Sequence, residues 1–259
     1  ADAPELDVAF ILLHGPLGED GAMQGLLDLL GLPYQGSGIL GSAVAMNKNF
    51  SKMLYKQAGL PVAEWVMAKP EDINNPAAIS NKLQFPLVIK PVSQGSSLGM
   101  SIAHNDDELA EGLQQAFKYD QEVMVEEFLQ GREITGGVIG NEKLESLPLV
   151  EIIPGKEHPF FNYEAKYQAG ASQEICPADF PTDITQKAQE YARKAHQALH
   201  LKGYSRTDMI VGEDGKIAMI ETNTIPGMTP TSLLPQAAKA AGYSFPQLLD
   251  RLIELALGK

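Results

Sequence analysis

Four polar side chains toward the C-terminal end of the sequence could together hold a metal ion beside a negatively charged substrate. They are two carboxylates, an amide and a guanidinium: Asp208, Glu221, Asn223 and Arg206. Carboxylate and amide oxygens are hard ligands of the kind that Mg²⁺ prefers, and they leave coordination positions for water and substrate phosphates. The same residues also fit a simpler arrangement, an acidic and solvated strand end beside a structural salt bridge. The rest of the chain bears on this choice.

A predicted β-hairpin would bring these four side chains together. Two apolar runs flank the turn 212–215 (GEDG), which is typical of a hairpin. If Val211 pairs with Lys216, then Arg206 lies opposite Glu221. Because side chains alternate along a strand, the four polar side chains then point the same way, at the open end of the hairpin. The opposite face is expected to be buried and carries Thr207, Met209, Val211, Ala218 and Ile220.

Two lysines and a glycine-rich loop could bind phosphate groups. Lys90 ends a short apolar run just before Pro91, where a strand end could place its charge over a cleft. The loop 94–100 (QGSSLGM) offers backbone N–H and serine hydroxyl donors to an anion. The loop matches no Walker A motif and could also be a plain hairpin, and Lys90 could be a surface residue. Lys48 is a single helix lysine, which would usually be solvated.

An acidic segment between two predicted strands, at 126–133, could bind a nucleoside. Glu126 and Glu127 end a predicted strand, and Glu133 begins the next one. An extended crossing segment can offer its backbone N–H and C=O groups to an adenine edge, and a nearby carboxylate can accept hydrogen bonds from ribose hydroxyls. The simpler alternative is a pair of exposed acidic residues at a strand end.

The composition excludes several classes of function. The net charge of −13 argues against a nucleic-acid or anionic-membrane surface, whereas ATP needs only a few local lysines and a metal. Apolar residues make up 44% of the 259 positions, as is usual for soluble globular proteins, and no apolar run is long enough to span a bilayer. The single cysteine, Cys176, and a first segment unlike a signal peptide predict a reducing, cytoplasmic location.

The expected helices and strands alternate unevenly, which favours two small α/β lobes over a barrel. Strands are predicted, besides the hairpin, at 7–13, 64–67, 87–90, directly after 100, and at 123–127, 133–139 and 147–152. Helices are predicted up to residue 30 and at 40–57, 75–83, 106–117 (capped by Asp106), 182–199 and 245–257.

With these pieces in order, the chain resembles the D-alanine–D-alanine ligases of the ATP-grasp superfamily from about Asp7 to its end. The strings that carry the resemblance are 14–21 (HGPLGEDG), 33–38 (PYQGSG), 164–167 (EAKY) and 223–229 (NTIPGMT). The resemblance implies an ATP-grasp fold with two α/β lobes that clamp ATP, preceded by a truncated parallel α/β N-terminal domain. The implied boundaries are 1–46 for the remnant, 47–130 for the central lobe, and 131–259 for the C-terminal lobe with the metal and second-substrate site.

The resemblance also implies roles for the matching positions. ATP would be bound by Lys48, Lys90, Gly95, Ser96, Ser97, Glu126, Glu127, Leu129, Glu133 and Lys166, with Glu126, Glu127 and Leu129 at the adenine and Glu133 at the ribose. Two Mg²⁺ ions, or Mn²⁺ in their place, would be held by Asp208, Glu221 and Asn223. The catalytic groups would be Arg206, Ser96, Tyr167 and Gly227, and the substrate would contact His14, Arg206, Tyr167, Gly227, Ser232 and Leu233. Lys166 and Tyr167 would lie on a loop that closes over the site.

The function implied by the resemblance is ATP-dependent joining of two D-alanine molecules, through a D-alanyl phosphate, for peptidoglycan synthesis. A homodimer formed through the N-terminal lobe is also implied. The sequence departs from the family at Asn47, where aspartate is usual, and it lacks a first strand–helix unit that supplies a substrate-binding glutamate. Two alternatives therefore stay open. One is an ATP-binding ligase core without ligation activity, and the other is a ligase with D-serine or D-lactate as acceptor.

Overall fold

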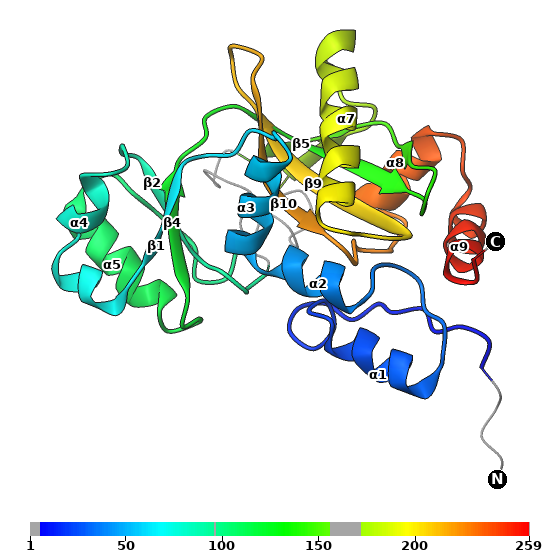
Figure 1. Ribbon diagram of the computed structural model, residues 1–259. Helices are drawn as coiled ribbons and strands as arrows, with labels where there is room; N and C mark the ends of the chain where they lie inside the picture. Colours follow the sequence, from blue (N-terminus) through cyan, green and yellow to red (C-terminus); the bar gives the residue numbers. More distant parts are fainter. Residues whose placement is uncertain (1–5, 96, 156–171, 259) are drawn as a thin grey trace.

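The computed structural model describes residues 6–95, 97–155 and 172–258, which form two antiparallel sheets with helices packed on them (Figure 1). The first sheet has the order β1-β4-β2-β3, with bounds β1 Trp65–Ala68, β2 Leu87–Pro91, β3 Ser101–Ala103 and β4 Val123–Glu127. The second has the order β10-β9-β5-β7-β8, with β6 paired to β5. Its bounds are β5 Arg132–Ile139, β6 Glu145–Ser146, β7 Val150–Pro154, β8 Ser172–Ile175, β9 Tyr204–Val211 and β10 Ile217–Asn223.

The first sheet packs on one side against three short helical elements: η1 Pro70–Asn74, α4 Ala77–Ser80 and α5 Asp106–Ala116. Leu109 and Leu113 of α5 and Ile89 of β2 are fully buried in the core between them. The predicted cap of α5 was wrong by one residue. The side chain of Asn105, outside the helix, accepts the backbone N–H of Glu108 at 2.9 Å.

The second sheet is covered on both faces. Helix α7 (Thr182–Ala198) packs on the face that carries Met209, and α8 (Leu233–Ala240) and α9 (Phe245–Ala256) pack near the other (Figure 1). Two adjacent glycines of β5 allow α7 to approach one face of the sheet closely and α8 to approach the other. A Cβ at Gly136 would lie 2.9 Å from the Cβ of Ala192 in α7, and one at Gly137 would lie 2.9 Å from a methyl of Leu234 in α8.

Between residue 6 and the first sheet, the structure has three helices: α1 Ala22–Leu30, α2 Ile39–Met46 and α3 Lys48–Gln57. The single helix predicted at 40–57 is thus two helices, because Asn47 has extended backbone angles between them. The Asn47 side chain accepts the N–H groups of Asn49 and Phe50 and so caps α3. Helix α3 reaches the second sheet, where the Tyr55 hydroxyl donates to Thr222 Oγ1 at 2.7 Å.

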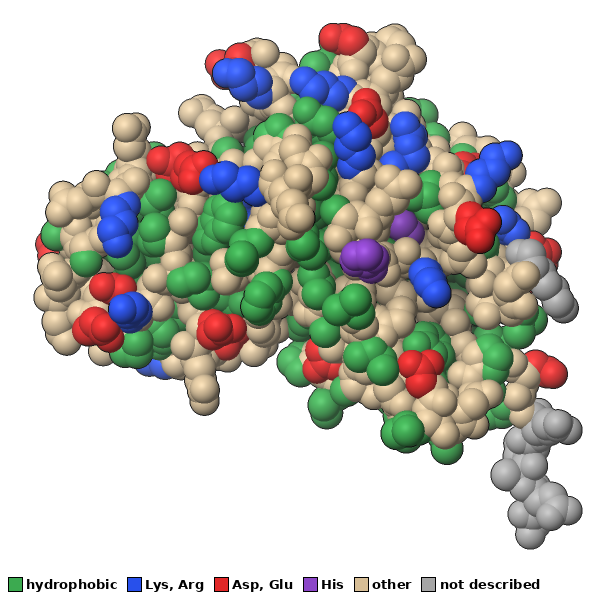
Figure 2. Space-filling model, viewed as in Figure 1, with side chains coloured by type: hydrophobic (Ala, Val, Ile, Leu, Met, Phe, Trp, Pro, Cys, Tyr) green, Lys and Arg blue, Asp and Glu red, His purple; other side chains and the backbone are tan. Residues whose placement is uncertain are grey.

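The strand predicted at 7–13 was wrong. Only Ala9 forms a bridge, parallel to Tyr34, and beyond it the Gln35 side chain replaces a neighbouring strand. Its amide accepts the N–H of Ile11 and donates to the Ile11 carbonyl, each at 2.7 Å. Leu12 and Leu13, at the end of this run, are 52% and 51% exposed. On the face drawn in Figure 2, apolar side chains also lie exposed over α1, and acidic and basic side chains are mixed.

Candidate active site

An open cleft lies between the two sheets, and both sheets line it. Its polar residues from the first lobe include Lys90 and Glu126, and those from the second sheet include Glu133, Asp208 and Glu221. Apolar side chains complete the walls: Val88, Leu98, Met100, Ile102, Phe128, Ile210 and Ile220. A cleft of this kind suits a ligand with a flat apolar part and a highly charged part.

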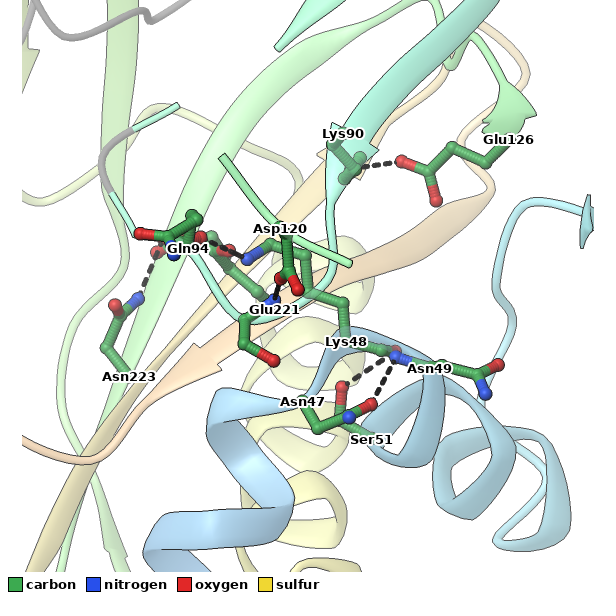
Figure 3. Close-up of polar contacts among 12 residues, drawn as sticks. Asn47, Lys48, Asn49, Ser51, Lys90, Gln94, Asp120, Glu126, Glu221 and Asn223 are labelled. Carbon is green, nitrogen blue, oxygen red and sulfur yellow. Dashed lines mark hydrogen bonds and ion pairs between the residues drawn. The ribbon is translucent and has the colours of Figure 1, made fainter. Parts of the chain in front are cut away.

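Glu126 in β4 is held between two lysines. Its Oε1 pairs with Lys90 of the adjacent strand β2 (Figure 3). Its Oε2 lies 2.5 Å from the ammonium of Lys52 in α3. All three side chains are buried. Burial alone would raise the pKa of Glu126, but the charges of Lys90 and Lys52 outweigh it and lower the pKa to about 2. The two lysines therefore favour the ionised form of the carboxylate at this wall of the cleft.

Lys48 lies on the same side of the cleft and links it to the second sheet. Its ammonium donates to the Gln94 carbonyl at 2.6 Å and lies 3.7 Å from the Glu221 carboxylate (Figure 3). Its backbone N–H also bonds to Val92, which anchors the start of α3 beside the glycine-rich loop. Asn47 precedes it as a neutral cap, so the residue that departs from the family pattern has a structural role here.

The hairpin of β9 and β10 has a different register from the one predicted. Val211 pairs with Ile217, not with Lys216, which shifts the first part of the hairpin by one residue. Ala218 and Ile220, expected on the buried face, are only half-buried, and Ile217 and Met219 are buried instead. The expected burial of Thr207, Met209 and Val211 is confirmed.

A β-bulge then restores the arrangement at the open end. Between Met219 and Glu221 the ladder shifts, so that Glu221 lies opposite Asp208 and Asn223 opposite Arg206. The predicted pairing of Arg206 with Glu221 was therefore wrong. The bulge nevertheless brings Asp208 and Glu221 to the same wall of the cleft, as the hairpin argument required.

Arg206, Asp208 and Asn223 form one hydrogen-bonded group. The guanidinium of Arg206 holds the Asp208 carboxylate with two bonds of 3.0 and 2.9 Å, and the Asn223 amide donates to Asp208 at 3.2 Å. Burial would lower the pKa of Arg206, but the attraction of Asp208 outweighs it and raises the pKa. Among the described residues no three His, Cys, Asp or Glu side chains gather as a metal site.

A second polar region lies beyond this group, where α8 begins. A Cβ at Gly227 would lie 2.8 Å from the hydroxyl of Ser232, the residue before α8, so the two are in close contact. The same hydroxyl accepts the N–H of Thr229. The first N–H groups of a helix favour an anion, and the side chain of Leu233, the first helical residue, is buried.

His14, from the N-terminal part of the chain, lies near the backbone of Ile225. Its ring lies 3.7 Å from the Glu19 carboxylate, which also accepts the N–H of Gly15 at 2.6 Å. The hydrogen bond and charge of Glu19 raise the pKa of His14 against burial and the repulsion of Arg206. His14 and Arg206 are thus close enough to influence each other electrostatically.

Comparison with known proteins identifies the family. The model of the D-ala D-ala ligase C-terminus matches residues 54–254, and that of the N-terminus matches residues 1–37. The chain is 60% identical to the D-alanine--D-alanine ligase of Syntrophobacter fumaroxidans over 258 residues. The matched region covers 99% of this chain and 82% of that protein. The chain belongs to the D-alanine–D-alanine ligase family.

Solved structures agree with this assignment. VanG D-Ala:D-Ser ligase from Enterococcus faecalis has a TM-score of 0.90 and 37% identity, over 98% of this chain and 74% of that one. D-alanine--D-alanine ligase from Bacillus anthracis, solved in complex with ATP, has a TM-score of 0.83 and 36% identity, over 97% of this chain and 79% of that one. The predicted α/β fold of the ATP-grasp type is confirmed by these neighbours and by the two antiparallel sheets.

The structure brings one part of the predicted site residues into the cleft. Those that line it are Lys48, Lys90, Ser97, Glu126, Glu127, Leu129, Glu133, Asp208 and Glu221. A second part does not line the cleft: Gly95, Arg206, Asn223, His14, Gly227, Ser232 and Leu233. The predictions for Ser96, Lys166 and Tyr167 fall outside the described residues.

Sequence reasoning missed Lys52, although its position carried a signal. It follows Lys48 by one helical turn on a predicted helix, and this spacing places both side chains on one face of that helix. The apolar walls were also missed, because their residues are spread over four strands and two connecting segments. In the part of the chain that the structure describes, no helix is long and apolar enough to cross a membrane.

Proposed function

We propose that this chain binds ATP in the cleft and joins two D-alanine molecules to D-alanyl-D-alanine, through a D-alanyl phosphate, for peptidoglycan synthesis. One observation carries the proposal: in this member of the family, the cleft is lined by Lys48 and Lys90 on one side and by Asp208 and Glu221 on the other. Positive and metal-binding groups on facing walls are what phosphoryl transfer needs, since that reaction depends on positioning and charge neutralisation. Because ATP is the co-substrate, we place the reaction in the cytoplasm.

The nucleotide would lie across both lobes. Apolar walls such as Ile102 and Phe128 would contact the adenine. Glu126 would face its amino group, with the backbone of Glu127 and Leu129 along the same edge. Glu133 would accept from the ribose, and Lys48, Lys90 and the loop residues Gly95, Ser96 and Ser97 would bind the phosphates.

Two chemical steps then follow. A carboxylate oxygen of the first D-alanine attacks the γ-phosphorus of ATP, the bond to the bridging oxygen breaks, and ADP leaves. The amine of the second D-alanine attacks the carbonyl carbon of the acyl phosphate, and phosphate leaves from the tetrahedral intermediate as the peptide bond forms. Arg206 and the backbone N–H of Gly227 would stabilise the oxyanion of that intermediate.

Asp208, Glu221 and Asn223 fit Mg²⁺, because they are oxygen donors on two adjacent strands at the cleft end. When bound, Mg²⁺ would neutralise charge on the transferring phosphates. The second D-alanine carboxylate would bind at the start of α8, at Ser232 and the backbone N–H of Leu233. His14, with its raised pKa beside Glu19, would contact the first substrate. Lys166 and Tyr167 would close over the site, and Ser96 and Tyr167 would orient the substrate.

We further propose the division of the chain at 46/47 and 130/131. All strands of the first sheet lie between residues 65 and 127, and all described strands of the second lie between 132 and 223, which supports the second boundary. A homodimer through the N-terminal part, and Mn²⁺ in place of Mg²⁺, are inferred from the family resemblance.

D-Serine is a second candidate acceptor, because the E. faecalis neighbour with a TM-score of 0.90 is a D-Ala:D-Ser ligase. The test is ADP formation from ATP and Mg²⁺ with no amino acid, with D-alanine, and with D-alanine plus D-serine or D-lactate. D-Alanine-dependent ADP and a product with the mass of D-alanyl-D-alanine are expected. ATP binding without D-alanine-dependent turnover would instead show a ligase core that does not ligate, and a mixed product would show the other acceptor.

A further inference from the structure

Lys52 is a buried lysine with no role in the scheme so far. Its side chain is 1% exposed, and it does not line the cleft, so it cannot reach a phosphate there. Its ammonium lies 2.5 Å from Glu126 Oε2, and the ring of Trp65 lies 5.6 Å away. Lys90 occupies the other oxygen of the same carboxylate. Glu126 therefore has one lysine on the cleft side and one behind it.

Burying an ammonium group is costly, and stability alone does not account for it. Burial lowers the pKa of Lys52 although Glu126 attracts its charge. Buried ion pairs are often replaced by apolar side chains of similar size without loss of stability. A methionine would fill the space beside Trp65 with much less desolvation. The retained charge thus points to a task performed through Glu126.

We propose that Lys52 is a positioning residue for nucleobase recognition: it holds the Glu126 carboxylate by Oε2, so that Oε1 can accept the exocyclic amino group of adenine when Lys90 turns to the phosphates. This inference rests on the proposed ATP-binding function of the cleft. Lys52 itself touches neither base nor phosphate and acts only by fixing the charge and orientation of Glu126.

The charges explain why two lysines are needed. With Lys90 alone, its departure toward a phosphate would leave Glu126 buried and unpaired, which is strongly unfavourable. Lys90 would then stay on the carboxylate, and phosphate binding would weaken. With Lys52 fixed at Oε2, Glu126 keeps one partner throughout, and the adenine amino group can replace Lys90 at Oε1.

The same arrangement would select the base. An ionised carboxylate only accepts hydrogen bonds, so it can pair with the 6-amino group of adenine but not with the 6-oxo group of hypoxanthine. A base that presents an oxygen to Glu126 would also repel it. We therefore expect the protein to bind ATP in preference to inosine triphosphate (ITP), and we expect Lys52 to be needed for that preference.

Helix α3 provides a matched control. Lys56 lies one turn after Lys52, its ammonium is also 5.6 Å from the Trp65 ring, but its side chain is 58% exposed and pairs with exposed Glu64. We would measure the dissociation constants of ATP and ITP by calorimetry, with Mg²⁺ and without D-alanine, for the natural chain, Lys52→Met and Lys56→Met. Lys52→Met should weaken ATP binding about 10- to 100-fold, the range for hydrogen bonds to charged groups, and ITP binding less. Lys56→Met should change neither by more than about 2-fold.

The preference for ATP over ITP separates positioning from stability. If Lys52→Met lowers both affinities equally, or leaves both unchanged, the proposal is overturned. Glu126→Gln gives a second test should Lys52→Met not fold, because an amide can donate to the 6-oxo group. That variant should shift the preference toward ITP, and an unchanged preference would overturn the proposal. The binding assay needs no turnover, so a failure of D-alanine ligation would leave this result readable by itself.

Discussion

Arg206 has a fixed place that a lysine cannot fill. Its guanidinium makes two parallel bonds to Asp208, a fork that a single ammonium cannot reproduce. We expect Arg206→Lys to lower kcat about 10²- to 10³-fold, the usual cost of one lost oxyanion donor, with a smaller change in KM for ATP. Steady-state ADP release measures both parameters. Arg251→Lys, at an exposed pair with Glu254, is the control and should keep full activity. A near-normal rate in Arg206→Lys would make Arg206 only a structural partner of Asp208.

Glu221 is the cleaner test of the metal site. Asp208 also neutralises the half-buried Arg206, so its removal would disturb the fold and the metal site together. Glu221→Gln keeps the size of the side chain and removes one anionic ligand. The Mg²⁺ concentration for half-maximal activity should rise at least about 10-fold, because the remaining ligands carry less charge. Asp214→Asn, in the exposed hairpin turn, should leave the Mg²⁺ titration unchanged. The assignment of Glu221 fails if its variant titrates like the natural chain.

At the scale of single residues, types and spacing predicted the polar part of the cleft well. Lys90 and Glu133 were predicted from their positions at strand ends and from the family resemblance, and both line the cleft. The partners of these residues could not be predicted, because they depend on packing between distant segments. Lys52 reaches Glu126 across 74 positions of sequence, and only the tertiary fold shows that the two meet.

At the scale of elements, errors arose where one side chain replaces a backbone partner. Gln35 bonds both backbone groups of Ile11, so the apolar run 7–13 forms no strand beyond a bridge. Asn47 divides a continuous helical pattern by capping its second half. The hairpin was predicted one residue out of register at its turn. Periodicity cannot reveal a bulge, and the bulge before Glu221 shifts the register again, so that Glu221 lies opposite Asp208.

The contact between α7 and β9 makes stability depend on pH. His196 of α7 is buried, with its Nδ1 2.8 Å from the Ser205 hydroxyl of β9, and burial lowers its pKa from 6.5 to about 4. The folded state thus favours the neutral ring, and its advantage is lost as pH falls from about 6.5 toward 4. This group alone should reduce the free energy of unfolding by about 3 kcal/mol at pH 4 relative to pH 7.

Urea unfolding at several pH values measures this dependence. His196→Gln cannot become charged, so the loss of stability between pH 6.5 and pH 4 should be about 3 kcal/mol smaller than in the natural chain. The exposed His104→Gln variant should keep the natural pH dependence. Parallel pH curves for the natural chain and His196→Gln would show that His196 is not the group responsible.

At the scale of the whole molecule, the cleft lies between two sheets that have separate cores. One core lies between the first sheet and α5, and the others lie on the two faces of the second sheet. The uneven alternation of the expected helices and strands predicted two lobes but not how they meet. The junction is short, since only residues 128–131 connect β4 to β5. Ligands at such a junction stabilise both lobes, because each lobe supplies part of the binding energy.

ATP should therefore protect both sheets at once. At an ATP concentration 100 times the dissociation constant, the free energy of unfolding should rise by about 2.7 kcal/mol. Hydrogen exchange should slow in β2 and β4 of the first sheet and in β9 and β10 of the second, because residues of all four strands line the cleft. Helix α9 does not contribute to the cleft lining, and its exchange by local opening gives the internal reference. Protection confined to the first sheet would mean that the nucleotide binds one lobe only. Asp208 and Glu221 would then lie too far from its phosphates to assist their transfer.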